Sequence, residues 1–166
     1  MTSNSISVII PAFNAEKTIR RALRSVENQS VLPKEVIVVD DCSSDRTNEI
    51  IREYMKESRL VIRHEIQSTN SGAASARNAG WLLASEKYVA FLDADDIWSR
   101  NKLSEQVEIL EDNSDVSLVI SPYVIFSNVN KVDNLRLVIH KNPKKLLNRW
   151  IEMRGYGARH VVFASA

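Results

Sequence analysis

The chain alternates short apolar runs with amphipathic stretches, and this alternation limits the folds open to it more than any other feature. The apolar runs are rich in β-branched residues, and several are apolar at consecutive positions, as is typical of strands covered on both faces. They are ISVII at 6–10, EVIVV at 35–39, LVIRHEI at 60–66, KYVAFL at 87–92 and VSLVI at 116–120. Between them, helical spacing or helix-forming composition predicts helices at 15–28, 45–56, 72–84 and 99–112. Repeated strand–helix cycles predict an α/β domain with a mainly parallel central sheet flanked by helices.

Composition narrows the class of protein. The chain has 166 residues, which suits one domain or one domain with part of another. Lys and Arg number 22 and Asp and Glu 21, so the formal net charge of +1 predicts no nucleic-acid partner. The single cysteine, Cys42, excludes an internal disulfide and agrees with a cytoplasmic, reducing compartment. We expect no signal peptide and no membrane span, because no apolar run approaches ~20 residues, although peripheral association with the inner face of the plasma membrane stays compatible with the sequence.

Polar clusters follow three of the predicted strands at the point where each strand ends. The segments are PAFN at 11–14, DDCSSD at 40–45 and DADD at 93–96. In open α/β sheets, ligands bind beyond the carboxyl ends of the strands. If the three strands are parallel neighbours, carboxylates from two loops converge on one rim of the sheet, and the binding site is expected there.

The DADD segment carries the clearest chemical signal. Asp93 and Asp95 stand two positions apart, a spacing that directs both carboxylates to a similar side of an extended segment. Hard divalent ions such as Mg²⁺ bind to one or two carboxylates and complete their shell with phosphate oxygens and water. We therefore expect a metal at Asp93 and Asp95, whereas Asp96 is open to a second interpretation as a residue that begins or caps the turn before the next helix.

The DDCSSD segment has two readings. Asp45, with its neighbouring serines, is expected to cap the helix at 45–56. Capping does not explain Asp40 and Asp41, because one cap does not need two further acids at the strand end. These two acids are therefore candidates for ligand binding.

The segment TNSGAASARNAG, at 69–80, leads into the third predicted helix. Gly72 would let the backbone approach a ligand at the start of that helix. Arg77 is either a phosphate ligand or an ion-pair partner of Asp93 or Asp41. A plain packing helix is the alternative for the whole segment.

Together these clusters, in this order, resemble the inverting family 2 glycosyltransferases of the GT-A fold. The matching segments are SVIIPAFNAEKTIRRALRSVENQS, EVIVVDDCSSDRT, NSGAASARNAG and YVAFLDADDIW, and they cover about residues 5–125. The resemblance implies a Rossmann-like nucleotide-sugar-binding fold. It also implies transfer of a sugar, with inversion, from a nucleotide diphosphate sugar to an acceptor hydroxyl, usually with Mg²⁺ or Mn²⁺. A UDP-sugar is the favoured donor, and a saccharide or lipid-linked saccharide of envelope polysaccharide or glycolipid assembly is the expected acceptor.

The resemblance also implies roles for residues around the nucleotide. Pro11, Phe13 and Asn14 border the base pocket, Asp41 accepts a hydrogen bond from the base, and Asp40 lies beside it. This chain departs from the family at Phe13, where Tyr is usual. It departs again at Cys42, where Gly is common, which raises the question of how that loop turns.

On the diphosphate side, the resemblance assigns the DxD element to Asp93 and Asp95. Asp95 is expected nearest the metal and Asp93 nearest the ribose or the waters of the metal. Arg77 is expected close to the donor.

Beyond residue 125 the resemblance supplies no motif. We expect residues 1–125 to be the donor half of the domain and residues 126–166 to be the truncated start of an acceptor half, with the catalytic base after Ala166. The final HVVFASA is expected to be a strand cut short without a partner, with a helix before it at 143–153. An uncovered sheet edge would favour oligomers.

Two other functions fit parts of the pattern. A sugar-phosphate nucleotidyltransferase is also metal-dependent and α/β, but it should carry a Gly-rich, basic loop after the first strand, which PAFNAEKT lacks. A receiver-like signalling domain also gathers carboxylates on a doubly wound sheet. It needs a later lysine on another strand, and the sequence offers no persuasive one.

Overall fold

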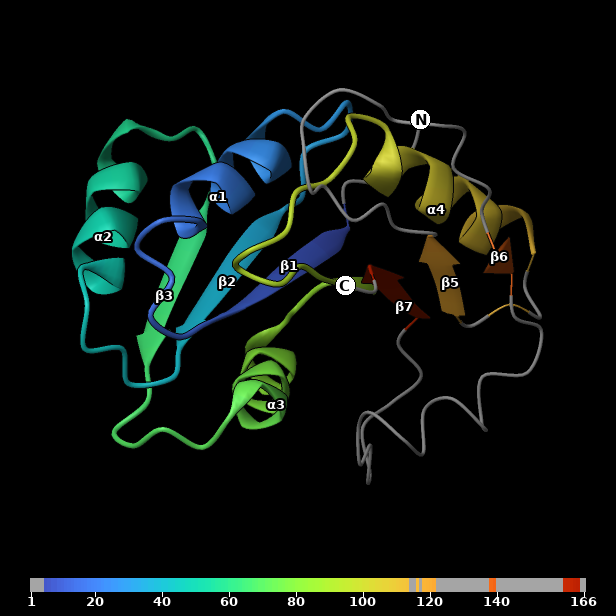
Figure 1. The fold of residues 1–166 in the computed structure, drawn as a ribbon. Coiled ribbons are helices and arrows are strands. Elements are labelled where there is room, and N and C mark those ends of the chain that lie inside the picture. The colour runs from blue at the N-terminus through green and yellow to red at the C-terminus, as the bar shows by residue number, and fades with distance from the viewer. Residues whose placement is uncertain (1–4, 114–115, 117, 122–137, 140–159, 165–166) are drawn as a thin grey trace.

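The computed structural model describes residues 5–113, 116, 118–121, 138–139 and 160–164. One sheet forms the middle layer, with helices on both of its faces (Figure 1). The strands are β1 (Ile6–Ala12), β2 (Glu35–Asp40), β3 (Ile62–Ile66), β4 (Tyr88–Phe91), β5 (Leu118–Ser121), β6 (Val138–Ile139) and β7 (His160–Ala164). The helices are α1 (Ile19–Glu27), α2 (Thr47–Glu57), α3 (Ala73–Leu83) and α4 (Lys102–Asp112).

The strand order across the sheet is β3-β2-β1-β4-β7-β5-β6. All neighbouring strands are parallel except β5 and β6, which are antiparallel. The predicted α/β fold with a mainly parallel sheet is therefore confirmed. The chain runs outward from β1 through β2 to β3 and then returns to place β4 on the other side of β1. This reversal beside β1 is where a parallel α/β sheet opens a crevice for a ligand.

Alternate residues of the central strands supply two separate cores. Val8, Ile10 and Val36 point to the face covered by α1, α2 and α4. Ile9 and Ile37 point to the opposite face, which α3 covers. This two-sided burial explains why the strands are apolar at consecutive positions.

The last strand corrects one expectation. β7 was expected to have no partner, yet it lies between β4 and β5 and is parallel to both, with Val161 opposite Val89 on one side and Leu118 on the other. The sheet thus continues past residue 125 (Figure 1). A local apolar pattern identifies a strand but does not say which distant strand it pairs with. The helix expected at 143–153 lies outside the described residues.

Two helices begin later than their apolar spacing suggests. α1 begins at Ile19 rather than at residue 15, and α4 begins at Lys102 rather than at residue 99. Before α1, the amide of Ala15 donates to Thr47 Oγ1 at 2.7 Å and the amide of Glu16 donates to an Asp45 carboxylate oxygen at 3.0 Å. Contacts with Asp45 of the β2–α2 loop and with Thr47 at the start of α2 thus hold this stretch at the rim of the sheet.

Close packing of α3 against the sheet predicts a large effect of one substitution. A Cβ on Gly80 would overlap Ile9 Cγ2 and lie 3.3 Å from Val39 Cγ2. We expect Gly80→Ala to lower the free energy of unfolding by about 1–3 kcal/mol, since the overlap forces the helix away from β1. Urea denaturation is the measurement. Asn78→Ala, at an exposed position of the same helix, is the control; equal stability of the two variants would contradict this packing.

Candidate functional site

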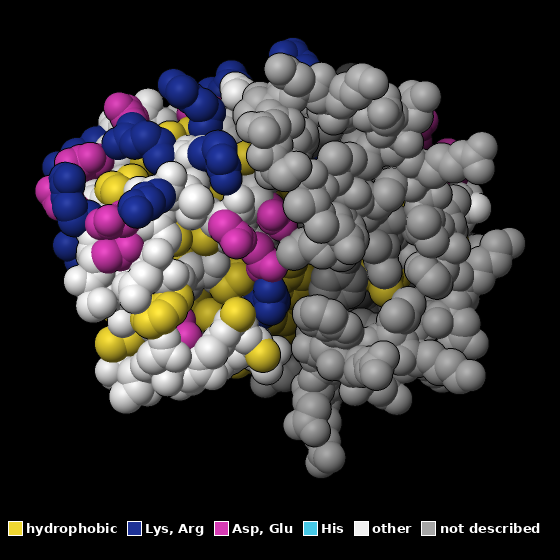
Figure 2. Space-filling view, viewed as in Figure 1, with side chains coloured by type: hydrophobic (Ala, Val, Ile, Leu, Met, Phe, Trp, Pro, Cys, Tyr) yellow, Lys and Arg dark blue, Asp and Glu magenta, His cyan; other side chains and the backbone are white. Residues whose placement is uncertain are grey.

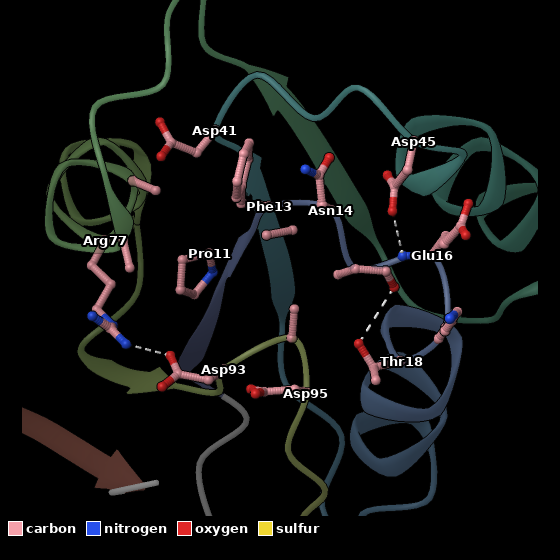
Figure 3. Close-up of a pocket in the computed structure, with 16 residues that line it drawn as sticks. Pro11, Phe13, Asn14, Glu16, Thr18, Asp41, Asp45, Arg77, Asp93 and Asp95 are labelled. Atoms are coloured by element: carbon pink, nitrogen blue, oxygen red, sulfur yellow. Dashed lines mark hydrogen bonds and ion pairs between the residues drawn. The ribbon is translucent and has the colours of Figure 1, made fainter.

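A cavity of about 640 Å³ opens at the carboxyl edge of β1, β2 and β4, within the size range of small-molecule sites. Its walls come from the end of β1 and the segment after it, the loop after β2, the first turns of α3 and the loop after β4 (Figure 3). Most residues predicted from the sequence line it: Pro11, Phe13, Asn14, Asp41, Arg77, Asp93 and Asp95. In Figure 2, acidic side chains gather beside a basic one next to an apolar hollow.

Asp41 joins two walls of the cavity. It is only 2% exposed, and its carboxylate accepts hydrogen bonds from the amides of Ser71 at 2.8 Å and Gly72 at 2.7 Å. Its own amide donates to the carbonyl of Ala12 at 2.8 Å. Asp41 therefore ties the start of α3 to the end of β1. A carboxylate has about four acceptor positions, so two amides leave room for a ligand donor.

Gly72 stands next to the cavity rather than in its wall. It has φ +87°, and no atom lies within 4 Å of the position that a Cβ would take. The backbone here uses the left-handed region that glycine enters without steric cost, and it leaves open space at the start of α3.

Asp40 has a different place from the one expected. The sequence places it beside Asp41 among the substrate-binding residues, but Asp40 is fully buried and does not line the cavity. Its carboxylate accepts hydrogen bonds from the amide of Ser43 at 2.9 Å, from the Ser43 hydroxyl and from Asn48 Nδ2 at 3.0 Å. Asp40 therefore holds the β2–α2 loop from beneath.

The β2–α2 loop makes its turn with Cys42 at a position where glycine is common in the family. Cys42 has φ +63°, in the left-handed region that glycine prefers, so the loop makes the turn despite the side chain. Asn14, at φ +46°, faces it from the neighbouring loop. The amide of Asn14 donates to Ser43 Oγ, and its side-chain oxygen accepts from the amide of Ser44, both at 2.9 Å.

The loop after β4 concentrates negative charge. Arg77 of α3 forms an ion pair with Asp93, in which the two side chains are 19% and 26% exposed. Asp95 is exposed and lines the cavity. Burial raises the pKa of Asp96, and the charges of Asp95 and Asp93 raise it further, while Arg21 opposes the shift. Mutual repulsion of this kind is relieved when a cation binds.

A divalent metal fits these residues on chemical grounds. Within the described part of the chain, no group of three or more His, Cys, Asp or Glu side chains could enclose a metal. With Asp93 engaged by Arg77, Asp95 is the carboxylate that is exposed toward the cavity. One carboxylate with phosphate oxygens and water is an arrangement that Mg²⁺ accepts, so the site suits a metal that arrives with a phosphorylated ligand.

Sequence reasoning missed several residues of the cavity wall: Glu16, Lys17, Thr18, Asp45, Ala73 and Ala76. Lys17 matters most, because it and Arg77 are the cationic side chains among the lining residues. The helix predicted over 15–28 includes residues 15–18, whereas α1 begins at Ile19 and these residues lie at the cavity. The polar AEKT stretch directly after PAFN was the signal that could have extended the predicted rim.

The comparison with known sequences identifies the family. Residues 7–161 match the profile described as Glycosyl transferase family 2, and the chain belongs to this family. The resemblance predicted from the motifs is thus confirmed, and the nucleotidyltransferase and receiver alternatives are set aside. None of the described helices is long and apolar enough to cross a membrane.

Two curated relatives show what similar proteins do. The chain is 43% identical over 110 residues to the putative teichuronic acid biosynthesis glycosyltransferase TuaG of Bacillus subtilis, a match covering 66% of this chain and 43% of the relative. It is 37% identical over 123 residues to the UDP-Glc:alpha-D-GlcNAc-diphosphoundecaprenol beta-1,3-glucosyltransferase WfgD of Escherichia coli, covering 74% of this chain and 47% of the relative. The chain thus spans less than half the length of these relatives.

Solved structures share the fold. S. aureus TarS 1-349 in complex with UDP-GlcNAc matches with a TM-score of 0.66 and 33% identity, over 78% of this chain and 37% of that one. The mannosyltransferase PcManGT from Pyrobaculum calidifontis, in complex with GDP-Man and Mn²⁺, matches with a TM-score of 0.65 and 28% identity, over 70% of this chain and 34% of that one. The TM-scores of both neighbours confirm that the described sheet has the GT-A fold.

The buried position of Asp40 predicts a structural role. Asp40→Ala leaves the Ser43 amide and the Asn48 side chain without their charged acceptor, and such hydrogen bonds are worth about 1.5–3 kcal/mol. We expect a loss of unfolding free energy of this size in thermal or urea denaturation. Asp112→Ala, an exposed acid at the end of α4, should leave stability nearly unchanged. An Asp40 variant as stable as the Asp112 variant would show that the loop does not depend on this carboxylate.

Proposed function

We propose that this chain binds the donor of an inverting glycosyltransferase, with a UDP-sugar as the favoured donor. The observation that carries the proposal is the cavity itself. It joins an acceptor carboxylate at the end of β2, an exposed aromatic ring after β1 and a carboxylate loop after β4, at the reversal point of the sheet. The first two groups suit a nucleotide base, and the carboxylate loop suits a ribose and a diphosphate with its metal.

The base is assigned to the part of the cavity beside Phe13 and Pro11. Phe13 is 50% exposed, so its ring offers flat apolar surface to a planar ligand. Asp41 supplies a hydrogen-bond acceptor, which pairs with a ring N–H donor such as that of uracil. The UDP-Glc in the name of WfgD and the UDP-GlcNAc bound by TarS support uridine over other bases.

The diphosphate is assigned to the loop after β4. Asp95 is the proposed direct ligand of Mg²⁺ or Mn²⁺, and Asp93, held by Arg77, is proposed to face the ribose or the waters of the metal. Lys17, which also lines the cavity, adds positive charge for the phosphates. The bound metal would neutralise charge on the leaving diphosphate. The Mn²⁺ in the complex of PcManGT supports a divalent ion in this part of the family.

The reaction proposed is a single in-line displacement at the anomeric carbon of the sugar. A carboxylate deprotonates the acceptor hydroxyl, and the nucleoside diphosphate leaves on the opposite side. We assign no base among residues 1–125, which we propose as the donor half, and we place the acceptor side from residue 126 onward. A saccharide or lipid-linked saccharide at the inner face of the cytoplasmic membrane is the proposed acceptor, supported by the diphosphoundecaprenol substrate named for WfgD.

Neutralising the proposed metal ligand tests the diphosphate assignment. Asp95→Asn keeps the size of the side chain but removes the charge, so the affinity for UDP in the presence of Mn²⁺ should fall by more than about tenfold. Isothermal calorimetry measures this affinity. Glu105→Gln, an exposed acid on α4, serves as the control for charge loss. If Asp95→Asn binds UDP with Mn²⁺ as the parent does, the metal assignment fails.

The base assignment predicts a different pattern for Asp41. Asp41→Ala should weaken binding of uridine and UDP alike, by about 1.5–3 kcal/mol, because a charge-assisted hydrogen bond to the base is lost. Asp95→Asn should leave uridine binding intact. Calorimetry with each ligand, after a check by circular dichroism that the variant is folded, separates the two. Unchanged affinity in the Asp41 variant would show that Asp41 only holds the amides of Ser71 and Gly72 and does not bind the base.

A further inference from the structure

We propose that Arg21 of α1 is a positioning residue that holds the main chain of Asp95 so that its carboxylate faces the donor. The inference rests on the proposed function, since it assigns Arg21 to the diphosphate side of that site. Arg21 Nη2 donates a hydrogen bond to the carbonyl oxygen of Asp95 at 2.9 Å, although the two residues are 74 positions apart. Nothing in the local sequence around either residue indicates this contact.

The contact completes a clamp on the loop after β4. On one side, Arg77 of α3 forms an ion pair with the Asp93 carboxylate. On the other side, Arg21 of α1 holds the Asp95 carbonyl. Because α3 and α1 cover opposite faces of the sheet, the loop is fastened from both layers at once. Figure 3 shows Asp93 and Asp95 between the Arg77 side and the ribbon of α1.

The two arginines act on different parts of the loop. Arg77 occupies a carboxylate, whereas Arg21 binds a main-chain oxygen and leaves the Asp95 carboxylate available. A main-chain bond fixes the position of the residue without consuming its ligand atoms. Precise placement of this kind is what a metal-binding carboxylate needs before the cation and the diphosphate arrive. The positive charge of Arg21 beside this acidic loop also reduces the repulsion among its carboxylates.

The other arginines of α1 donate no hydrogen bond to the loop after β4 among the described residues, so this contact is particular to Arg21. Arg20 forms ion pairs with Glu53 and Glu57 of α2. Arg24 is exposed, and its side chain donates no hydrogen bond to a described residue. Arg24 lies one turn along the same helix and carries the same charge, so it supplies a matched control.

The test compares Arg21→Met, Arg21→Lys and Arg24→Met in the 166-residue chain. We expect Arg21→Met to lower the affinity for UDP with Mn²⁺ by about threefold to tenfold, the effect of one lost hydrogen bond, and to leave the affinity for uridine unchanged. In metal-free protein, hydrogen–deuterium exchange of a peptide covering residues 93–98 should be faster in Arg21→Met. Arg21→Lys should recover part of both effects, and Arg24→Met should match the parent in both.

Two results would overturn the proposal, and a third would count against the proposed function on which it rests. Equal exchange and equal UDP affinity in Arg21→Met and Arg24→Met would show that the contact positions nothing. An equal loss of uridine and UDP affinity would show a general structural effect. A parent chain that fails to bind UDP with Mn²⁺ counts against the proposed function, whereas the exchange comparison still decides whether Arg21 holds the loop.

Discussion

Backbone amides bound by carboxylates from neighbouring loops hold the cavity together. Asp41 accepts from Ser71 and Gly72, and Asp45 accepts from the amides of Thr47 and Glu16 at 2.9 and 3.0 Å. Burial alone would raise the pKa of Asp45, but its hydrogen bonds lower the pKa overall. Ionised carboxylates make strong bonds to amides, so each one fastens two segments that are distant in sequence. The end of β1, the loop after β2 and the start of α3 are therefore connected in one wall of the cavity.

The acids at the rim consequently fall into two groups. The carboxylate oxygens of Asp40 and Asp45 accept hydrogen bonds from the protein itself. Asp41 uses about half of its acceptor positions in the same way. Asp93 and Asp95 lie across the cavity, and Asp95 presents its carboxylate without a partner among the described residues. This separation follows from position, because acids at the end of β2 have helix and loop amides within reach, whereas those after β4 lie in a turn open to the cavity. In the site that we propose, Asp40 and Asp45 serve loop stability, Asp95 serves metal binding, and Asp41 serves both the loops and the ligand.

The sheet links this site to the later part of the chain. β7 lies against β4, and β4 leads directly into the loop that carries Asp93 and Asp95. A strand from beyond residue 125 thus supports the strand that presents the proposed metal loop. The two halves that we propose for donor and acceptor therefore share one sheet.

The sequence by itself determined the fold class and most of the cavity wall. Alternating apolar runs and helical spacing depend on local periodicity, and the polar segments after β1, β2 and β4 mark the ends of those runs. Only the tertiary structure decided which acids are buried, which strands β7 pairs with, and that Arg21 contacts the carbonyl of Asp95. The roles of Asp40 and Asp41 illustrate the limit: they are adjacent and chemically identical, yet one faces Asn48 beneath the loop and the other faces Gly72 across it. Which partner each side chain meets depends on loops brought together by the sheet, and local patterns carry no record of such long-range contacts.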